Sequence, residues 1–277
     1  MSKQTEPIAL VTGASGGIGK SIAEKLAANG FYVFAAARRM DKLEAMRTSQ
    51  IEPLKLDVTD EAAIETAVAH ITRSKGRLDV LVNNAGYGLY GTIEGLSPQA
   101  VEHVFAVNVL GLGRMTQAIL PMMRQQRSGT VINISSVVGK VSMPGLGWYA
   151  ASKHAVEGMT DALRLEVKQF GINVVLVEPG VIDTGFEDVA VNTLDNSNEP
   201  PAYAPMVAAF RQSVRDSYKN APGPELVAQT VLKALSSNSP KARYRVGRDA
   251  KLLITARHLL GDGLFDRAVG SRVKAGK

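Results

Sequence analysis

Short, nearly continuous apolar runs rich in Val, Ile and Ala alternate along this chain with longer stretches of helical periodicity. Continuous apolar runs are typical of strands that are buried on both faces of a parallel sheet. An alternation of such strands with helices predicts a doubly wound α/β domain with helices on both faces, a Rossmann-type fold. The expected strands are residues 7–13, 31–37, 51–58, 77–86, 129–136 and 172–180, with a seventh in "ARYRVG" at 242–247.

The helical pattern stops between residues 183 and 205. This stretch is polar and ends in "NEPPAYAP", so we expect a lid or substrate loop without regular structure. No interdomain linker or internal repeat is visible, which favours a single domain over residues 1–277. The expected helices cover residues 17–29, 41–49, 60–75, 99–126, 148–170, 206–218 and 224–236.

The composition is that of a globular protein with a substantial core. Of the 277 residues, 45% are hydrophobic and 21% are charged, and there is no cysteine. The first residues lack the layout of a signal peptide, and no run reaches the roughly 18 apolar residues that span a bilayer. We therefore expect a cytoplasmic protein.

The net charge of +6 is concentrated in a basic C-terminal extension, residues 241–277, which carries ten Lys or Arg and three Asp or Glu. Such a segment can attract nucleic acid or an anionic membrane. No nucleic-acid motif is present, and "LLITARHLLGDGLF" could lie on a membrane surface. A solvated tail is the simpler interpretation, so membrane association is possible but not favoured.

A glycine-rich loop, "VTGASGGIGK", follows the first expected strand and opens the first expected helix. Glycine allows backbone N–H groups to approach a pyrophosphate, and the helix N-terminus favours the negative charge. A plain strand-to-helix turn is the alternative. The spacing T-G-x-x-x-G-I-G, together with "NNAG" at 83–86, resembles the short-chain dehydrogenase/reductase superfamily, and the resemblance covers roughly residues 7–186.

That resemblance implies a nicotinamide cofactor, and the end of the second strand favours NADP(H). Where the family's acidic residue would stand, the sequence has Ala37 followed by Arg38 and Arg39, although these could be ordinary helix-flanking arginines. We expect Arg38 to be the main ligand of the 2′-phosphate, with a hydroxyl from Ser15. The implied cofactor residues are Gly13, Ser15, Gly16, Gly17, Ile18, Gly19, Arg38, Arg39, Asp57, Val58, Asn84, Ala85, Gly86, Asn108, Tyr149, Lys153, Pro179, Gly180, Ile182 and Thr184.

The stretch "GWYAASKHAVEG" places Tyr149 and Lys153 four positions apart, on one face of a helix. A Y-x-x-x-K spacing alone is weak evidence. Ser136 lies thirteen residues before the tyrosine and is preferred over Ser135, and Asn108 in "FAVNVLG" matches a fourth family position. The resemblance therefore implies a catalytic tetrad of Asn108, Ser136, Tyr149 and Lys153.

Each tetrad residue has an expected role in carbonyl reduction. Ser136 donates a hydrogen bond to the developing oxyanion, and Tyr149 delivers a proton. Lys153 should lower the pKa of the Tyr149 phenol and hold the nicotinamide ribose. Asn108 would hold a water that links Lys153 to solvent.

The expected substrate pocket is mostly apolar and has no Arg or Lys to hold a carboxylate. We therefore expect a lipophilic ketone, aldehyde or secondary alcohol, as in the steroid and retinol dehydrogenases and acyl-dihydroxyacetone phosphate reductases that the chain also resembles. The predicted substrate contacts are Ser136, Val138, Met143, Tyr149 and Phe186, with Tyr87, Leu89, Tyr90, Val141, Leu146 and Trp148 as further candidates.

Two other functions stay open. One is a 3-oxoacyl thioester reductase that engages an acidic carrier, and the other is a non-catalytic NADP(H)-binding sensor. The four histidines lack metal-ligand spacing and no G-x-S-x-G is present, so we expect no metal and no hydrolase triad. The helices at 99–126 and 148–170 carry apolar stripes, and the resemblance implies a homodimer or homotetramer through them.

Overall fold

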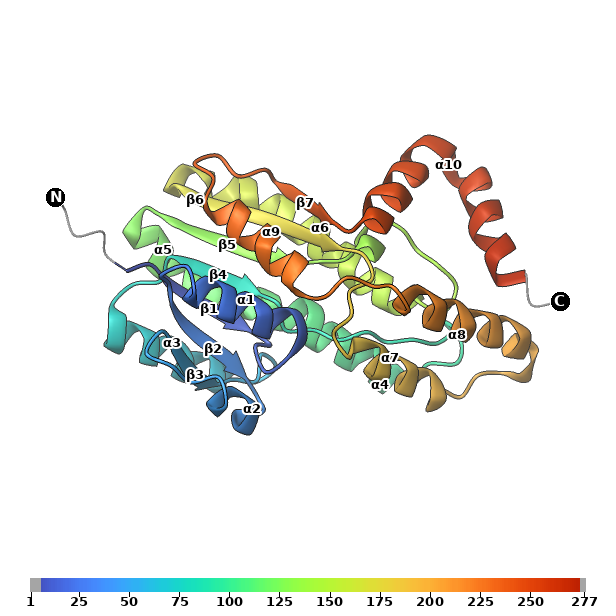
Figure 1. Cartoon of the computed structure of the whole chain (residues 1–277), viewed down its shortest axis with the longest axis horizontal. Helices are drawn as coiled ribbons and strands as arrows, with labels where there is room; N and C mark the ends of the chain where they lie inside the picture. Colours follow the sequence, from blue (N-terminus) through green and yellow to red (C-terminus); the bar gives the residue numbers. More distant parts are fainter. Residues whose placement is uncertain (1–5, 275–277) are drawn as a thin grey trace.

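Seven parallel strands form one sheet in the computed structural model, in the order β3-β2-β1-β4-β5-β6-β7 (Figure 1). The structure describes residues 6–274, and the side chains of 186–190 and 271–274 lie outside that description. The predicted doubly wound parallel sheet is confirmed. The strands are β1 Ile8–Thr12, β2 Tyr32–Ala37, β3 Ile51–Lys55, β4 Val80–Asn83, β5 Gly129–Ile134, β6 Ile172–Pro179 and β7 Arg243–Val246.

Helices cover both faces of the sheet because side chains of each strand alternate between two cores. In β1, Ala9 and Val11 face one core while Ile8 and Leu10 face the other. Helices α1 (Gly17–Ala27), α2 (Met40–Glu44) and α9 (Glu225–Leu235) cover the first face. Helices α3 (Glu61–Lys75), α5 (Leu112–Gln126) and α6 (Gly147–Val167) cover the second.

The long helix expected over 99–126 is divided. Helix α4 (Pro98–Phe105) and α5 are joined by η1 (Ala106–Gly111), a stretch of π-helix. Within the described residues, Pro98–Gln126 is the one stretch long and apolar enough to cross a membrane. Its side chains Met115, Ile119 and Met123 are buried against the sheet, so its apolar face belongs to the core.

The prediction that residues 183–205 lack regular structure is wrong. Helix α7 (Phe186–Asp195) and η4 (Pro201–Tyr203) lie there, followed by α8 (Ala204–Tyr218). Leu194 near the end of α7 is buried. Glu199 fixes the segment to the turn after β4, because its carboxylate accepts hydrogen bonds from the backbone and the side chain of Thr92 at 2.8 and 2.6 Å.

Residues 248–274 of the C-terminal extension form a long helix, α10 (Arg248–Lys274), instead of a solvated tail. Gly261 breaks it with a left-handed φ of 63°, so that two helical arms form a hairpin beside α8 (Figure 1). Ala250, Ile254 and Phe265 are buried in a core cluster shared with α8. The sequence pattern missed this helix because its charged residues interrupt the apolar face.

Candidate active site

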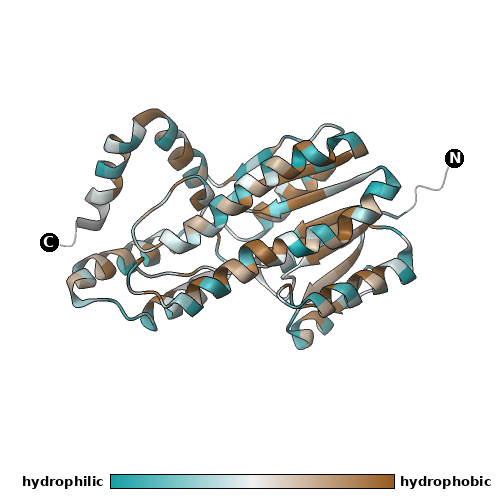
Figure 2. Ribbon diagram, turned by 180° about the vertical axis from the view of Figure 1, so that it is seen from behind, coloured by the Kyte–Doolittle hydropathy of each residue, from teal (hydrophilic) through white to brown (hydrophobic). Residues whose placement is uncertain are grey.

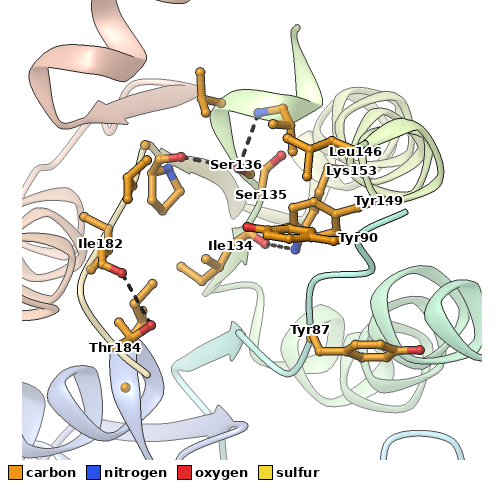
Figure 3. A pocket seen from close by; sticks show the side chains of 18 of the residues that line it. Tyr87, Tyr90, Ile134, Ser135, Ser136, Leu146, Tyr149, Lys153, Ile182 and Thr184 are labelled. Atoms are coloured by element: carbon orange, nitrogen blue, oxygen red, sulfur yellow. Dashed lines mark hydrogen bonds between the residues drawn. The ribbon is translucent and has the colours of Figure 1, made fainter. Parts of the chain in front are cut away.

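A cavity of about 1280 Å³ opens at the carboxyl edge of the sheet (Figure 3). Its walls come from the glycine loop, the ends of β2 to β6, the start of α6, and helices α8 and α10. Ligands of open α/β sheets bind at this edge. Gly19 and Asn108 do not line the cavity, and the side chain of Phe186 lies outside the described residues. All the other residues of the predicted tetrad, of the predicted cofactor set and of the five predicted substrate contacts line it.

Close contacts around the glycine loop leave no room for a side chain at Gly13 or Gly19. Gly13 has a φ of 67°, and a Cβ on Gly19 would overlap the side-chain nitrogen of Asn84. That amide donates to the carbonyls of Thr12 and Gly13 at 3.0 and 3.3 Å. The Thr12 hydroxyl accepts from the backbone N–H groups of Asn84 and Ala85, both at 3.0 Å. The loop therefore presents bare backbone at the N-terminus of α1, which suits a pyrophosphate.

Two arginines flank this loop in different ways. Arg39 donates from Nε and Nη2 to the Ser15 hydroxyl at 3.2 and 3.0 Å. Arg38 is 70% exposed, and its Nη1 lies 3.8 Å from the Asp57 carboxylate. The sequence pattern favoured Arg38 for the larger role, whereas the geometry puts Arg39 in contact with Ser15. This donor set fits a phosphorylated dinucleotide.

Asp57 is kept ionised in this corner of the cavity. Burial alone would raise its pKa, but hydrogen bonds from the Thr59 backbone and hydroxyl, at 2.9 and 2.7 Å, and the charge of Arg38 lower it below the usual value. A carboxylate here can accept hydrogen bonds from an adenosine group.

The three reacting side chains of the predicted tetrad converge where β5 ends and α6 begins (Figure 3). Tyr149 is buried and hydrogen-bonds with Ser136. Ser136 follows β5 in extended conformation, and its hydroxyl accepts from Val138 N–H at 3.3 Å. Lys153 donates from Nζ to the Ile134 carbonyl at 3.0 Å and lies 6.0 Å from the Tyr149 ring centre.

The expected lowering of the Tyr149 pKa is wrong for this structure. Burial raises the pKa of Tyr149 above its usual value, Tyr218 adds to the rise, and the hydrogen bond with Ser136 opposes it. Burial also lowers the pKa of Lys153 to about 8, against the opposing charge of Glu157. Burial is the largest cause of the pKa shift of both groups, because it disfavours their charged forms. Tyr149 is therefore a phenol at neutral pH, ready to donate a proton.

Asn108 lies in the π-helical stretch and is buried. Its side chain accepts from Tyr87 N–H and donates to the Tyr87 carbonyl, both at 3.0 Å, and donates to Ser152 at 3.1 Å. A Cβ on Gly86 would lie 2.9 Å from Asn108 Oδ1 and 3.7 Å from Lys153 Nζ. Asn108 thus fixes the turn after β4 beside Lys153, a contact that the sequence did not predict.

The segment after β6 closes the cofactor side of the cavity. Gly180 N–H donates to the Val246 carbonyl at 2.9 Å, and Val181 N–H donates to the Asp249 carboxylate at 2.8 Å. Thr184 stands against the glycine loop, where its Cβ would lie 3.0 Å from a Cβ added to Gly17. Pro179, Gly180, Ile182 and Thr184, which are the cofactor contacts predicted in this segment, all line the cavity.

The opposite wall is the apolar one, and it is only partly as predicted. Val138, Met143, Tyr87, Tyr90 and Leu146 line the cavity, whereas Leu89, Val141 and Trp148 do not. Trp148 packs edge-on against Phe105 and donates from Nε1 to the Ile93 carbonyl at 3.3 Å. The Trp148 indole therefore contacts the loop that contains Ile93 and does not face the cavity.

Helices α8 and α10 supply lining residues that sequence reasoning missed, because no motif connects them to the strands. Tyr218 of α8 is close enough to influence Tyr149 electrostatically. The other missed residues are Phe210, Ser213, Val214, Ser217, Asp249, Leu252, Leu253, Ala256, Leu260, Phe265, Ala268 and Val269. The one available signal was the apolar pair Ala250 and Ile254, which are one helical turn apart and buried.

This fold and site define a class of protein. The family model for short chain dehydrogenases matches residues 7–194, more than half of the chain. The chain therefore belongs to the short-chain dehydrogenase family and is an oxidoreductase. Three features of the structure agree with this membership: the parallel sheet, the glycine loop at its first turn and the Ser–Tyr–Lys cluster.

Individual relatives match along almost the full chain. A 3-ketodihydrosphingosine reductase of Bacteroides thetaiotaomicron is 35% identical over 95% of this chain and 96% of its own. An NADPH-dependent 3-dehydrocapnine reductase of Ornithobacterium rhinotracheale is 36% identical over 94% of each. The crystal structure of a short-chain dehydrogenase from Streptomyces avermitilis superposes with a TM-score of 0.82 at 35% identity, over 99% of this chain and 96% of that one.

Proposed function

We propose that this protein is an NADP(H)-dependent oxidoreductase that interconverts a carbonyl and a secondary alcohol on a lipophilic substrate, with Tyr149 as the general acid and base. One observation carries the proposal. The buried Tyr149 phenol, hydrogen-bonded with Ser136, lies in a cavity that has a dinucleotide-type loop at one end and an apolar wall at the other.

The nicotinamide supplies or accepts the hydride when it is bound. In the reductive direction negative charge develops on the substrate oxygen, and the Ser136 hydroxyl donates a hydrogen bond to that oxygen. Tyr149 transfers its phenolic proton to the same oxygen, so the alcohol forms and a phenolate remains. The Lys153 ammonium stabilises this phenolate, while Asn108 keeps the neighbouring turn in position. The oxidative direction reverses each transfer.

Preference for NADP(H) is supported by the charge around the adenosine end. Arg38 and Arg39 both line the cavity there, and Arg39 already bonds Ser15. A 2′-phosphate between two guanidinium groups would gain charge-assisted hydrogen bonds. The relative from Ornithobacterium is NADPH-dependent by name, which agrees with this assignment.

A lipophilic substrate is supported by the lining of the far wall. Phe210, Val214, Leu253 and Phe265 are apolar, and the one carboxylate among the described far-wall residues, Asp249, is bonded to Val181 N–H. No Lys or Arg of the described residues projects from this wall to hold an acidic substrate group. A relative whose name specifies a keto substrate, 3-ketodihydrosphingosine, fits the reductive chemistry.

The decisive experiment measures NADPH oxidation by wild-type protein and Tyr149→Phe against a panel of long-chain ketones, steroids, retinal, 3-oxoacyl thioesters and small aldehydes. We expect turnover with a lipophilic carbonyl, reduced about a thousandfold or more in the variant because the acid is lost. The affinity of the variant for NADPH, measured from the fluorescence of NADPH, should equal that of the wild type. Near-native turnover in the variant would refute the role of Tyr149. NADPH binding without oxidation of any panel member would favour a sensor.

A further inference from the structure

The α10 hairpin exposes leucines to solvent. Leu252, Leu259, Leu260 and Leu264 are 69%, 79%, 40% and 57% exposed. They make up half of the large hydrophobic side chains found exposed in the described part of the chain. Three of them flank the break at Gly261, so they gather at the apex of the hairpin, which stands away from the sheet (Figures 1 and 2). Clustered exposed apolar side chains mark an interaction surface.

The exposed leucines lie opposite a second apolar face of the same helix. Ala250, Ile254 and Phe265 are buried and attach the hairpin to α8. Leu252 and Leu259 are seven positions apart, which places them on one side of the first arm. The hairpin is thus held to the protein by one face while the leucine face stays free for something outside the chain.

Helix α10 as a whole has an excess of basic residues, because Arg248, Lys251, Arg257, Arg267, Arg272 and Lys274 outnumber Asp249, Asp262 and Asp266. Lys251, Arg257 and Arg267 stand on the two arms, while the Asp249 carboxylate is bonded to Val181 N–H of the body. Asp262 forms an ion pair with Arg257. After Asp266 the sequence adds Arg267, Arg272, Lys274 and Lys277 and no acidic residue. Exposed leucines at the apex of a helix that carries an excess of basic residues match the interface of an anionic bilayer.

We propose that the α10 hairpin docks on anionic lipid bilayers, with Leu259, Leu260 and Leu264 inserted among the acyl chains and the basic side chains at the headgroups. The same hairpin forms a wall of the cavity, because Leu252 and Leu260 belong both to the exposed face and to the lining. Docking would therefore bring the apolar end of the cavity against the lipid.

The test is co-sedimentation of the full chain with vesicles, either of phosphatidylcholine alone or of phosphatidylcholine and phosphatidylglycerol in equal parts. The variant combines Leu259→Ser and Leu264→Ser, two residues outside the cavity lining. The control is Leu165→Ser, because Leu165 is similarly exposed at 73% but lies near the end of α6, at the amino edge of the sheet. Circular dichroism and NADPH binding check that each variant is folded.

We expect wild-type protein and Leu165→Ser to sediment with the anionic vesicles, and less so at high salt. The double variant should partition at least about tenfold more weakly, since each inserted leucine contributes a tenfold factor or more. Failure of wild-type protein to bind, or equal binding by the double variant, would overturn the proposal. So would a dimer in analytical ultracentrifugation that the double variant dissociates without any vesicle binding, because the face would then join two copies. None of these outcomes depends on the substrate.

Discussion

Glu157 lies one helical turn beyond Lys153 and raises the pKa of that lysine, against the effect of burial. Its carboxylate is buried, 2.8 Å from Lys140 Nζ and 3.2 Å from Arg243 Nε. The negative charge of Glu157 raises the pKa of Lys153, although burial of the lysine prevails and holds that pKa at about 8. Lys153 therefore loses its positive charge as the pH rises through about 8.

We predict that kcat/KM for ketone reduction falls above about pH 8, and that Glu157→Gln moves this alkaline limb to lower pH. The variant removes the negative charge of Glu157 that favours the charged form of Lys153, so Lys153 deprotonates at a lower pH. A pH–rate profile measures the limb. Glu24→Gln, an exposed carboxylate that pairs with Lys20, serves as the control and should leave the limb in place. An unchanged limb in Glu157→Gln would show that Lys153 does not set it.

The two arginines at the end of β2 make a second prediction at this scale. Arg39→Ala and Arg38→Ala should each lower kcat/KM with NADPH about ten- to a hundredfold, the equivalent of one lost charge-assisted hydrogen bond. With NADH, which lacks the 2′-phosphate, both variants should perform as the wild type does. Arg38→Asp should shift preference toward NADH. An unchanged NADPH-to-NADH ratio in all three variants would remove the basis for the NADP(H) assignment.

The turn between β1 and α1 depends on glycine at one position in particular. A Cβ on Gly19 would overlap the Gly13 carbonyl oxygen, a backbone atom, so the whole loop would have to shift. We predict that Gly19→Ala weakens NADPH binding at least about tenfold and destabilises the fold by roughly 1–3 kcal/mol. Gly158→Ala is the matched control, because Gly158 is in α6 with open space around it. That change should stabilise the protein by up to about 1 kcal/mol. Equal effects of the two substitutions would contradict the steric argument.

Strands and cofactor loop were predictable because local physics determines them. Strand β1 is buried on both faces, and its sequence is accordingly apolar at every position but the last. Gly13 and Gly19, which follow β1, are required because neighbouring atoms leave no space for a side chain. Helices α7 and α10 were not predictable in the same way. Their buried positions, Leu194 and Ile254, belong to a core cluster with residues far away in sequence. In α10 the exposed leucines also reduce the contrast between the buried face and the solvent face. Tertiary packing decides such segments.

In the active site, too, some features could be predicted from the sequence and others could not. The resemblance to the family's motifs implied Ser136, Tyr149 and Lys153, and the structure brings them together. Their protonation could not be predicted, because burial depends on the whole cavity and reverses the expected shift of the Tyr149 pKa. The π-helical stretch that turns Asn108 toward Tyr87 adds a residue to a turn without leaving a sequence pattern.

At the scale of the molecule, a buried charge cluster joins the last two strands to α6. Glu178 of β6 is fully buried, with Arg243 Nε at 3.2 Å and Arg245 Nε at 3.5 Å. Neither carboxylate oxygen of Glu178 has a hydrogen-bond partner among the described residues. Burial and the nearby Glu157 raise the pKa of Glu178, and the surrounding cations only partly offset this. The ionised form of Glu178 therefore costs stability in the folded state.

Glu178→Gln should consequently stabilise the protein at neutral pH, although it removes two ion pairs. The pKa of Glu178 is higher in the folded state than in the unfolded state, so wild-type protein loses stability as the pH rises from the unfolded-state pKa through the folded-state pKa. The glutamine variant cannot ionise at this position and does not lose that stability. Arg243 stays compensated, since it also pairs with Glu157 and Asp161. Urea unfolding at about pH 5 and about pH 8 should give a larger advantage for the variant at the higher pH, on the order of 1 kcal/mol. Glu61→Gln, which removes an exposed pair with Arg114, should change little at either pH. A variant less stable than wild type at the higher pH would mean that the two arginines outweigh the desolvation of Glu178.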